Sequence, residues 1–382
     1  MASEIDVRAA LATVEEPALG IPITDLGVVR SIGVGRKSVR IDLALVLPPE
    51  WSEVELRRRV SIAVGGLTDV KKVDVVVSPM TDDELARAAA VLSGVPPVDP
   101  LRVVDANRPA EPKARVNPFT DASTRVIAVA SGKGGVGKSS VTTNLSIALA
   151  GLGRSVAAVD ADVWGFSMPR MLGVAHPPAL VGEVIIPPRA HGVALVSMGF
   201  FAQEDQAVVW RGPMLHKALE QFLTDVYWAR PDYLLIDMPP GTGDVSISIA
   251  QFLPRAEVLV VTTPQPAAQK VAQRAAAMAE QVNLDVLGVI ENMSWFQGDD
   301  GTRYEIFGAG GGAALSDRLG VPLLGRIPLV AALREGGDDG RPIVVAEPDS
   351  EAAQAFRAMA ERIDGELAPK RVYRSELKIT QS

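Results

Sequence analysis

The chain has 382 residues, of which 47% are apolar, and this is enough for two domains with a sizeable core. Its 38 basic and 46 acidic residues give a formal net charge of −8, which argues against a protein that coats nucleic acid. Because the sequence contains no cysteine, it excludes disulfides, thiolate metal sites and cysteine nucleophiles. The three histidines (His176, His191 and His216) are scattered and lack the spacing of zinc ligands.

No stretch has the length and apolar purity of a membrane span, and the N-terminal residues lack the apolar region of a secretory signal. The tail also lacks the long amphipathic stripe of a membrane-binding helix. We therefore expect a cytoplasmic protein that binds neither membrane nor nucleic acid.

Residues 1–94 are predicted to form a small α/β domain. Strands are expected at 28–34, 38–45 and 73–77, and the turn Gly35-Arg36-Lys37 indicates a hairpin between the first two. Helices are expected at 5–11 and 51–65, and a third helix opens at Thr81, a good N-cap followed by an acidic first turn. Residues 95–122 are rich in proline and are predicted to be an extended linker between two domains that move relative to each other.

From residue 123 to residue 369 apolar strands alternate with helices, which is typical of an α/β fold with a doubly wound, mostly parallel sheet. The expected strands are 125–130, 156–160, 233–237, 257–262, 285–290 and 323–327. Helices are expected at 140–152, 266–281 and 349–367, and residues 370–382 form a polar tail.

The stretch SGKGGVGKSS at 131–140 contains G-x-x-x-x-G-K-S between a buried strand and a helix, and this order is typical of a P-loop. Its glycines let backbone N–H groups wrap a polyphosphate, and the N-terminus of the helix faces the anion. A glycine-rich turn without a ligand is the alternative. The predicted ATP-binding residues in this stretch are Gly132, Lys133, Gly134, Gly135, Val136, Gly137, Lys138, Ser139 and Ser140.

Three later strand ends carry polar residues where parallel sheets bind ligands. Asp237 ends an apolar strand as a Walker B aspartate does, so Asp237 and Ser139 are predicted to bind Mg²⁺. Asp162 follows residues 156–160 and could orient water against a γ-phosphate, although Asp160 and Asp162 could equally cap a loop or helix. Asn292 has a carboxamide that can pair with adenine. The loop after Asp237 could act as a switch or simply be a strand-to-helix turn; its predicted switch residues are Pro240, Gly241, Thr242 and Gly243.

Lys133, directly after the first glycine of the loop, is not needed to cradle phosphate and could be a solvated loop charge. Its position resembles the deviant P-loop of the MinD/ParA/nitrogenase-iron-protein class. That resemblance implies a catalytic lysine that reaches the partner's nucleotide across a homodimer, acting with Lys138 and Asp162.

Most of the chain resembles the Mrp/ApbC family of iron–sulfur cluster carrier ATPases. The matching pieces are SGKGGVGKSS, Asp160-Ala-Asp162, PRMLG at 169–173, WRGPM at 210–214, DMPPGTGD at 237–244, GVIENMS at 288–294 and FGAGGG at 307–312. The start of the chain, with Val14-Glu15-Glu16-Pro17 and Asp25-Leu26-Gly27, resembles the small iron–sulfur assembly domain that precedes such ATPases. In that domain a cysteine-containing turn is common where this chain has Leu47-Pro48-Pro49-Glu50-Trp51, so a docking or folding role gains weight.

The resemblance implies ATP and Mg²⁺ as cofactors, a bridging [4Fe–4S] cluster, and iron–sulfur client or scaffold proteins as partners. The family holds its cluster with a Cys-x-x-Cys pair after the Glu-Asn-Met-Ser segment. Here residues 295–302 contain no thiolate, and we expect a tight turn and no iron–sulfur ligands. Two functions stay open: an ATP-hydrolysing carrier or assembly factor in iron–sulfur metabolism, and a MinD/ParA-like switch that binds or positions a partner.

Overall fold

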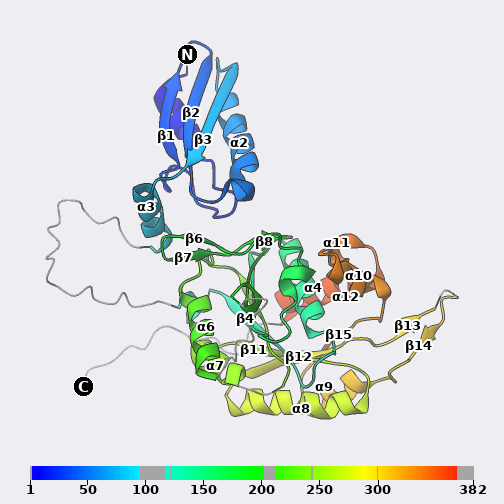
Figure 1. Ribbon diagram of the computed structural model, residues 1–382. Helices are drawn as coiled ribbons and strands as arrows, with labels where there is room; N and C mark the ends of the chain where they lie inside the picture. Colours follow the sequence, from blue (N-terminus) through cyan, green and yellow to red (C-terminus); the bar gives the residue numbers. More distant parts are fainter. Residues whose placement is uncertain are drawn as a thin grey trace, which may run out of the picture. The chain divides into compact units, whose positions relative to one another are not determined.

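The computed structural model describes residues 2–94, 117–120, 123–201, 212–241, 244–298 and 300–367. The chain divides into two compact units (Figure 1). The smaller unit takes the N-terminal part of the chain together with Pro178–Pro187 and Asp225–Ala229, and the larger unit takes the rest. Most of the predicted linker and all of the predicted tail lie outside the described residues.

The smaller unit is built on a three-stranded sheet in the order β1 (Val29–Val34), β2 (Ser38–Leu45) and β3 (Lys72–Pro79). β1 and β2 pair antiparallel, which confirms the predicted hairpin, and β3 runs parallel to β2. The helices are α1 (Glu4–Leu11), α2 (Pro49–Gly65) and α3 (Asp82–Leu92). Ser3 and Thr81 close capping boxes at the starts of α1 and α3. The antiparallel hairpin β6 (Ala179–Val181) and β7 (Val184–Ile186) adds Val181 and Ile186 to the apolar core of this unit.

The larger unit is organised around an eight-stranded sheet in the order β15-β12-β11-β4-β10-β5-β9-β8. All neighbours pair parallel except β8 and β9, which are antiparallel at one edge. The central strands are short, largely apolar and almost wholly buried, as parallel strands covered on both faces should be. The strands are β4 (Arg125–Ser131), β5 (Val156–Asp160), β8 (Arg189–Ala190), β9 (Val193–Ser197), β10 (Tyr233–Asp237), β11 (Glu257–Thr262), β12 (Asp285–Glu291) and β15 (Leu323–Arg326).

Helices cover both faces of this sheet, as predicted for a doubly wound fold (Figure 1). One layer contains α4 (Lys138–Gly151), α5 (Met168–Met171), α10 (Ala331–Asp338), α11 (Ile343–Ala346) and α12 (Glu351–Glu361). The other contains α6 (Gly212–Thr224), α7 (Asp244–Phe252), α8 (Pro266–Gln281) and α9 (Gly311–Leu319). A small hairpin of β13 (Phe296–Gln297) and β14 (Arg303–Tyr304) follows β12.

Several strand predictions are confirmed to the residue, including β5, β10 and β11. Several helix ends differ from the prediction: α2 begins at Pro49 rather than at residue 51, and two further differences have a structural reason. α4 begins at Lys138 rather than at residue 140, because the left-handed Gly137 already serves as its N-cap. The last helix was predicted to reach residue 367, but α12 ends at Glu361 and a π-helical turn (Arg362–Glu366) follows, in which Asp364 accepts hydrogen bonds from Arg154 and Tyr233.

Within the described ranges, no helix combines the length and the apolar character that crossing a membrane requires.

Candidate functional site

The phosphate-binding loop joins the end of β4 to the start of α4. All the predicted loop residues, from Gly132 to Ser140, lie in this turn and the first turn of the helix. Gly135 and Gly137 adopt left-handed φ values of 78° and 80°, which favour glycine. Gly132 is required for a different reason, since a Cβ there would lie 2.2 Å from the backbone carbon of Val271 in α8. The loop is therefore shaped by its own backbone and by α8.

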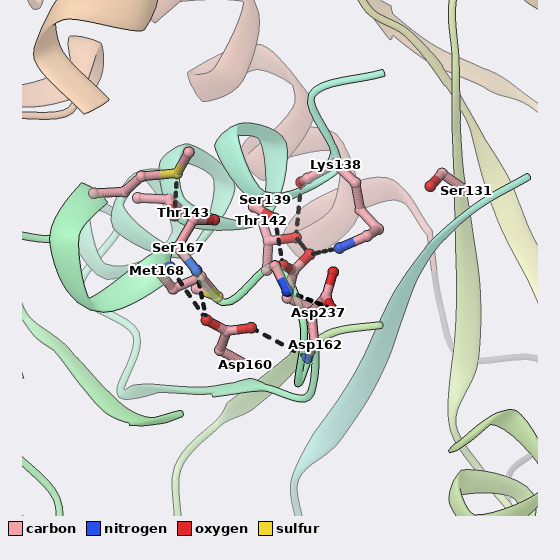
Figure 2. A network of polar contacts seen from close by, with 12 residues as sticks. Ser131, Lys138, Ser139, Thr142, Thr143, Asp160, Asp162, Ser167, Met168 and Asp237 are labelled. Carbon is pink, nitrogen blue, oxygen red and sulfur yellow. Dashed lines mark hydrogen bonds and ion pairs between the residues drawn. The ribbon is translucent and has the colours of Figure 1, made fainter. Parts of the chain in front are cut away.

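Asp237 ends β10 beside this loop and is fully buried (Figure 2). Its Oδ1 lies 2.6 Å from Nζ of Lys138 and accepts a 2.9 Å hydrogen bond from the Thr142 hydroxyl. Its Oδ2 accepts a 2.5 Å bond from the Ser139 hydroxyl. The structure thus brings together the predicted lysine and the two predicted metal ligands.

Thr142 is a residue of this site that the sequence analysis missed. It lies four positions after Lys138, so both side chains occupy the same face of α4. Its hydroxyl contacts the Lys138 carbonyl at 3.0 Å as well as Asp237. Helical spacing from Lys138 was the available signal, but a threonine that bonds back to the preceding turn is common in helices.

Asp160 and Asp162 follow β5 and hold the next loop (Figure 2). Asp160 Oδ2 accepts bonds from the backbone N–H groups of Ser167 and Met168, which start α5, and from the Ser197 hydroxyl. Burial, with a further contribution from the charge of Asp237, raises the pKa of Asp160 to about 7. Asp160 therefore caps the start of α5, which was the alternative role considered for it.

Asp162 Oδ1 accepts bonds from the backbone N–H groups of Trp164 and Gly165, at 3.2 and 3.0 Å. The side chain is 8% exposed, so it is almost buried at the edge of the site. These contacts order the loop that carries Asp162. Its predicted action on water remains a prediction.

Lys133 has a partner in its own chain: its Nζ donates a 3.1 Å hydrogen bond to Oε1 of Gln265, just before α8. The sequence had suggested no task for Lys133 within its own subunit, and this contact is one. The Ser131 hydroxyl donates to the Lys133 carbonyl at 3.0 Å and fixes the loop backbone at the same point. Gln265 was not among the predicted site residues.

Asn292 follows β12 and packs under the loop. Its Nδ2 donates a 2.8 Å bond to the Val136 carbonyl, and its Oδ1 accepts one from the Met293 N–H. The residue is 1% exposed, and a Cβ on Gly137 would overlap its Nδ2. The structure gives Asn292 a role in shaping the loop, while its contact with adenine remains a prediction.

Of the four predicted switch residues, Pro240 and Gly241 are described, whereas Thr242 and Gly243 lie outside the described residues. Gly241 has a φ of 101°, and its N–H donates a 3.2 Å bond to the carbonyl of Ser131 at the base of the loop. The start of the predicted switch loop is therefore joined to the phosphate-binding loop.

The segment 295–302 was expected to be a tight turn. Residues 296–298 and 300–302 of it lie in or between β13 and β14, and Asp299 lies outside the described residues. The turn is held by Asp300, which accepts bonds from the N–H and hydroxyl of Thr302; these bonds lower the pKa of Asp300. The guanidinium of Arg303 lies 4.6 Å from the ring centroid of Trp295. Among the residues that the structure describes, no cluster of three or more histidine, aspartate or glutamate side chains is placed to hold a metal ion, and the sequence has no cysteine.

The chain is similar to known proteins over most of its length. A family model described as "NUBPL iron-transfer P-loop NTPase" matches residues 122–364, and one described as "Iron-sulfur cluster assembly protein" matches residues 4–76. The iron–sulfur cluster carrier protein of Mycobacterium tuberculosis is 45% identical over 362 residues, covering 93% of this chain and 91% of that protein. The protein of the same name from Bacillus subtilis is 38% identical and covers 86% of this chain and 89% of that protein.

Two solved structures are similar in fold to more than half of this chain. A nucleotide-binding protein from Archaeoglobus fulgidus in complex with ADP is 33% identical with a TM-score of 0.52, covering 61% of this chain and 91% of that chain. The cell division ATPase MinD of Pyrococcus furiosus is 28% identical with a TM-score of 0.50, covering 63% and 98%. Because the two family models match and the carrier proteins are 38–45% identical over most of the chain, the chain belongs to the iron–sulfur cluster carrier family of MinD/ParA-like P-loop NTPases.

Proposed function

We propose that this protein is a Mg²⁺-dependent ATPase that serves iron–sulfur assembly as a nucleotide-gated homodimer and holds no cluster with its own residues. The observation that supports this most is the convergence of Lys138, Ser139 and Thr142 on the buried carboxylate of Asp237. A lysine, a hydroxyl and a carboxylate are the groups that bind the phosphates and the metal in P-loop NTPases.

Ser139 and Asp237 suit Mg²⁺ because both offer oxygen atoms, which this ion prefers, and their side chains are 2.5 Å apart. Bound there, Mg²⁺ would neutralise charge on the β- and γ-phosphates. Lys138 would exchange its contact with Asp237 for the phosphates, and the N–H groups of the loop would complete the cradle.

For hydrolysis, a water molecule attacks the γ-phosphate and ADP leaves, while lysine side chains stabilise the spreading negative charge. Asp162 would orient that water, and Lys133 of the partner subunit would reach the nucleotide across the dimer. To face adenine, Asn292 would exchange the bonds that its carboxamide makes to the Val136 carbonyl and the Met293 N–H. These roles rest on the family pattern and on the place of each residue around the loop.

Two observations support the dimer. Trp164 and Phe166 are 73% and 40% exposed in the loop that Asp162 orders, and two large apolar side chains exposed beside a binding site favour coverage by a partner. Lys133 is paired with a neutral amide, so its charge is not neutralised by a carboxylate among the described residues.

The cluster itself does not fit this chain. Iron–sulfur clusters bind thiolates, and the β13–β14 hairpin offers indole, guanidinium and carboxylate groups in their place. Client or scaffold proteins would therefore supply any cluster ligands. The same observation favours a second candidate function, a MinD/ParA-like switch whose output is the binding of a partner.

The test is nucleotide binding and turnover by the full chain. Isothermal titration should show ATP binding to the wild type and to the surface control Lys217→Ala, but none to Lys138→Ala. Hydrolysis should require Mg²⁺ and stop on chelation. Equal affinity of Lys138→Ala for ATP would refute the assignment of the site.

A further inference from the structure

The phosphate-binding loop carries two lysines with partners of different charge. Lys138 contacts a carboxylate, Asp237, at 2.6 Å, and both side chains are buried. Lys133 contacts a carboxamide, Gln265, at 3.1 Å and is partly exposed. A lysine with an amide partner keeps its net charge and is released more easily than a buried ion pair.

Gln265 is a fixed acceptor. It stands between Pro264 and Pro266, and a residue before proline is restricted to extended backbone, here φ −60° and ψ 131°. The carbonyl of Pro264 accepts a 3.1 Å bond from the side chain of Gln269, one turn into α8. The backbone that presents Gln265 is therefore held on both sides.

The loop is fixed to the same helix. Gly132 lies so close to α8 that a Cβ would be 2.2 to 2.5 Å from backbone atoms of Val271 and Ala272. The Ser131 hydroxyl holds the Lys133 carbonyl on the other side. Backbone contacts thus set the positions from which Lys133 and Gln265 meet, so their hydrogen bond is built into the fold.

We propose that Gln265 is a positioning residue that retains Lys133 within its own subunit and releases it when the nucleotide-bound dimer forms. This inference rests on the proposed function, in which Lys133 acts across the dimer. A neutral acceptor suits the task, because a carboxylate would cancel the charge that the partner's nucleotide needs. Retention keeps a long cationic side chain in one place before the partner arrives, and the retained state competes with the productive one.

The experiment changes the strength of this contact in both directions and measures kcat at saturating Mg·ATP in the full chain. Gln265→Glu makes an ion pair with Lys133 and should lower kcat about tenfold. Gln265→Leu removes the acceptor and should raise kcat about two- to threefold, the size expected for a partly exposed hydrogen bond. Gln281→Glu, the same change at an exposed position at the end of α8, should leave kcat as in the wild type.

Both Gln265 variants are repeated with Lys133→Ala. If Gln265 acts through Lys133, their effects should disappear there, whereas plain repulsion of phosphate by the introduced carboxylate would persist. The loss of rate in Gln265→Glu should also shrink as salt screens the partly exposed pair. Shifts in the same direction for both variants, no shift, or shifts that survive Lys133→Ala would each overturn the proposal.

The same variants also test the proposed function separately from the role of Gln265. If Lys133→Ala alone hydrolyses ATP as fast as the wild type, the action of Lys133 across the dimer fails, and the role of Gln265 fails with it. If Lys133→Ala is slow but the Gln265 variants behave as the wild type, only the positioning role fails.

Discussion

Gly132→Ala should damage both the stability of the larger unit and the nucleotide site. The added Cβ would lie 2.2 Å from a backbone carbon of α8, whereas ordinary contacts begin at 3.4 Å, so the loop and the helix must separate by about 1.2 Å. Overpacking against backbone costs roughly 3 kcal/mol, at the upper end of the usual range. For a unit of this size that lowers the melting temperature by about 6–12 °C.

Gly134→Ala is the matched control, because it adds the same methyl group to the same loop. A Cβ there meets nothing within 4 Å, and the residue has no left-handed φ, so the cost should stay within about 0.5 kcal/mol. Calorimetric melting of both variants without nucleotide checks the difference, and titration with ATP should show weaker binding by Gly132→Ala. Equal melting temperatures for the two variants would show that the contact with α8 does not constrain the loop.

Three further predictions concern other residues. Thr142→Val keeps the shape of a buried side chain but removes a hydrogen-bond donor to Asp237, so ATP turnover should fall about three- to tenfold with little change in melting temperature. Unchanged turnover would show that Thr142 has no role in the site. Burial raises the pKa of Glu16 above 4.5, so the folded state loses stability as pH rises from 4.5 through the raised pKa. The stability of Glu16→Gln relative to the wild type should therefore increase with pH. A constant difference in stability between pH 4 and pH 8 would contradict this. Anaerobic reconstitution with iron and sulfide should give no absorption band near 400 nm in the wild type, and one in the double variant Gln297→Cys, Asp300→Cys; a band in the wild type would refute the absence of ligands.

The parts of the fold that could be predicted are those fixed by local sequence. β5, β10 and β11 are uninterrupted apolar runs with a polar residue at or near the end, and their bounds follow from that pattern. β9 (Val193–Ser197) is equally buried but was not predicted, and it lies among short strands and turns that break up the regular alternation. The start of α4 was missed because it depends on the backbone conformation of Gly137.

The site residues likewise divide into those that belong to a local motif and those that meet only through the fold. The lysine, serine and aspartate of the phosphate site were predicted because each belongs to a local motif with known chemistry. Gln265 could not be predicted, since it meets Lys133 across 132 residues of sequence. That meeting depends on β4 lying between β10 and β11, an order in the sheet that differs from the order in the chain. The orientation of Asn292 toward Val136 has the same origin, as it depends on how β12 is placed in the sheet.

The hydrogen bond from the Gly241 N–H to the Ser131 carbonyl is the contact through which nucleotide binding would change the loop after Asp237. Gly132 packs directly against the backbone of α8, so the phosphate-binding loop is held in place, whereas the loop after Asp237 is attached to it at Gly241. Breaking one such hydrogen bond costs about 1 kcal/mol net, while a ligand that binds at micromolar concentration contributes about 8 kcal/mol. Phosphate contacts therefore have ample free energy to displace the backbone at Gly241. The first visible sign of ATP should be faster amide exchange at Gly241, while the amides of residues 132–138 exchange more slowly.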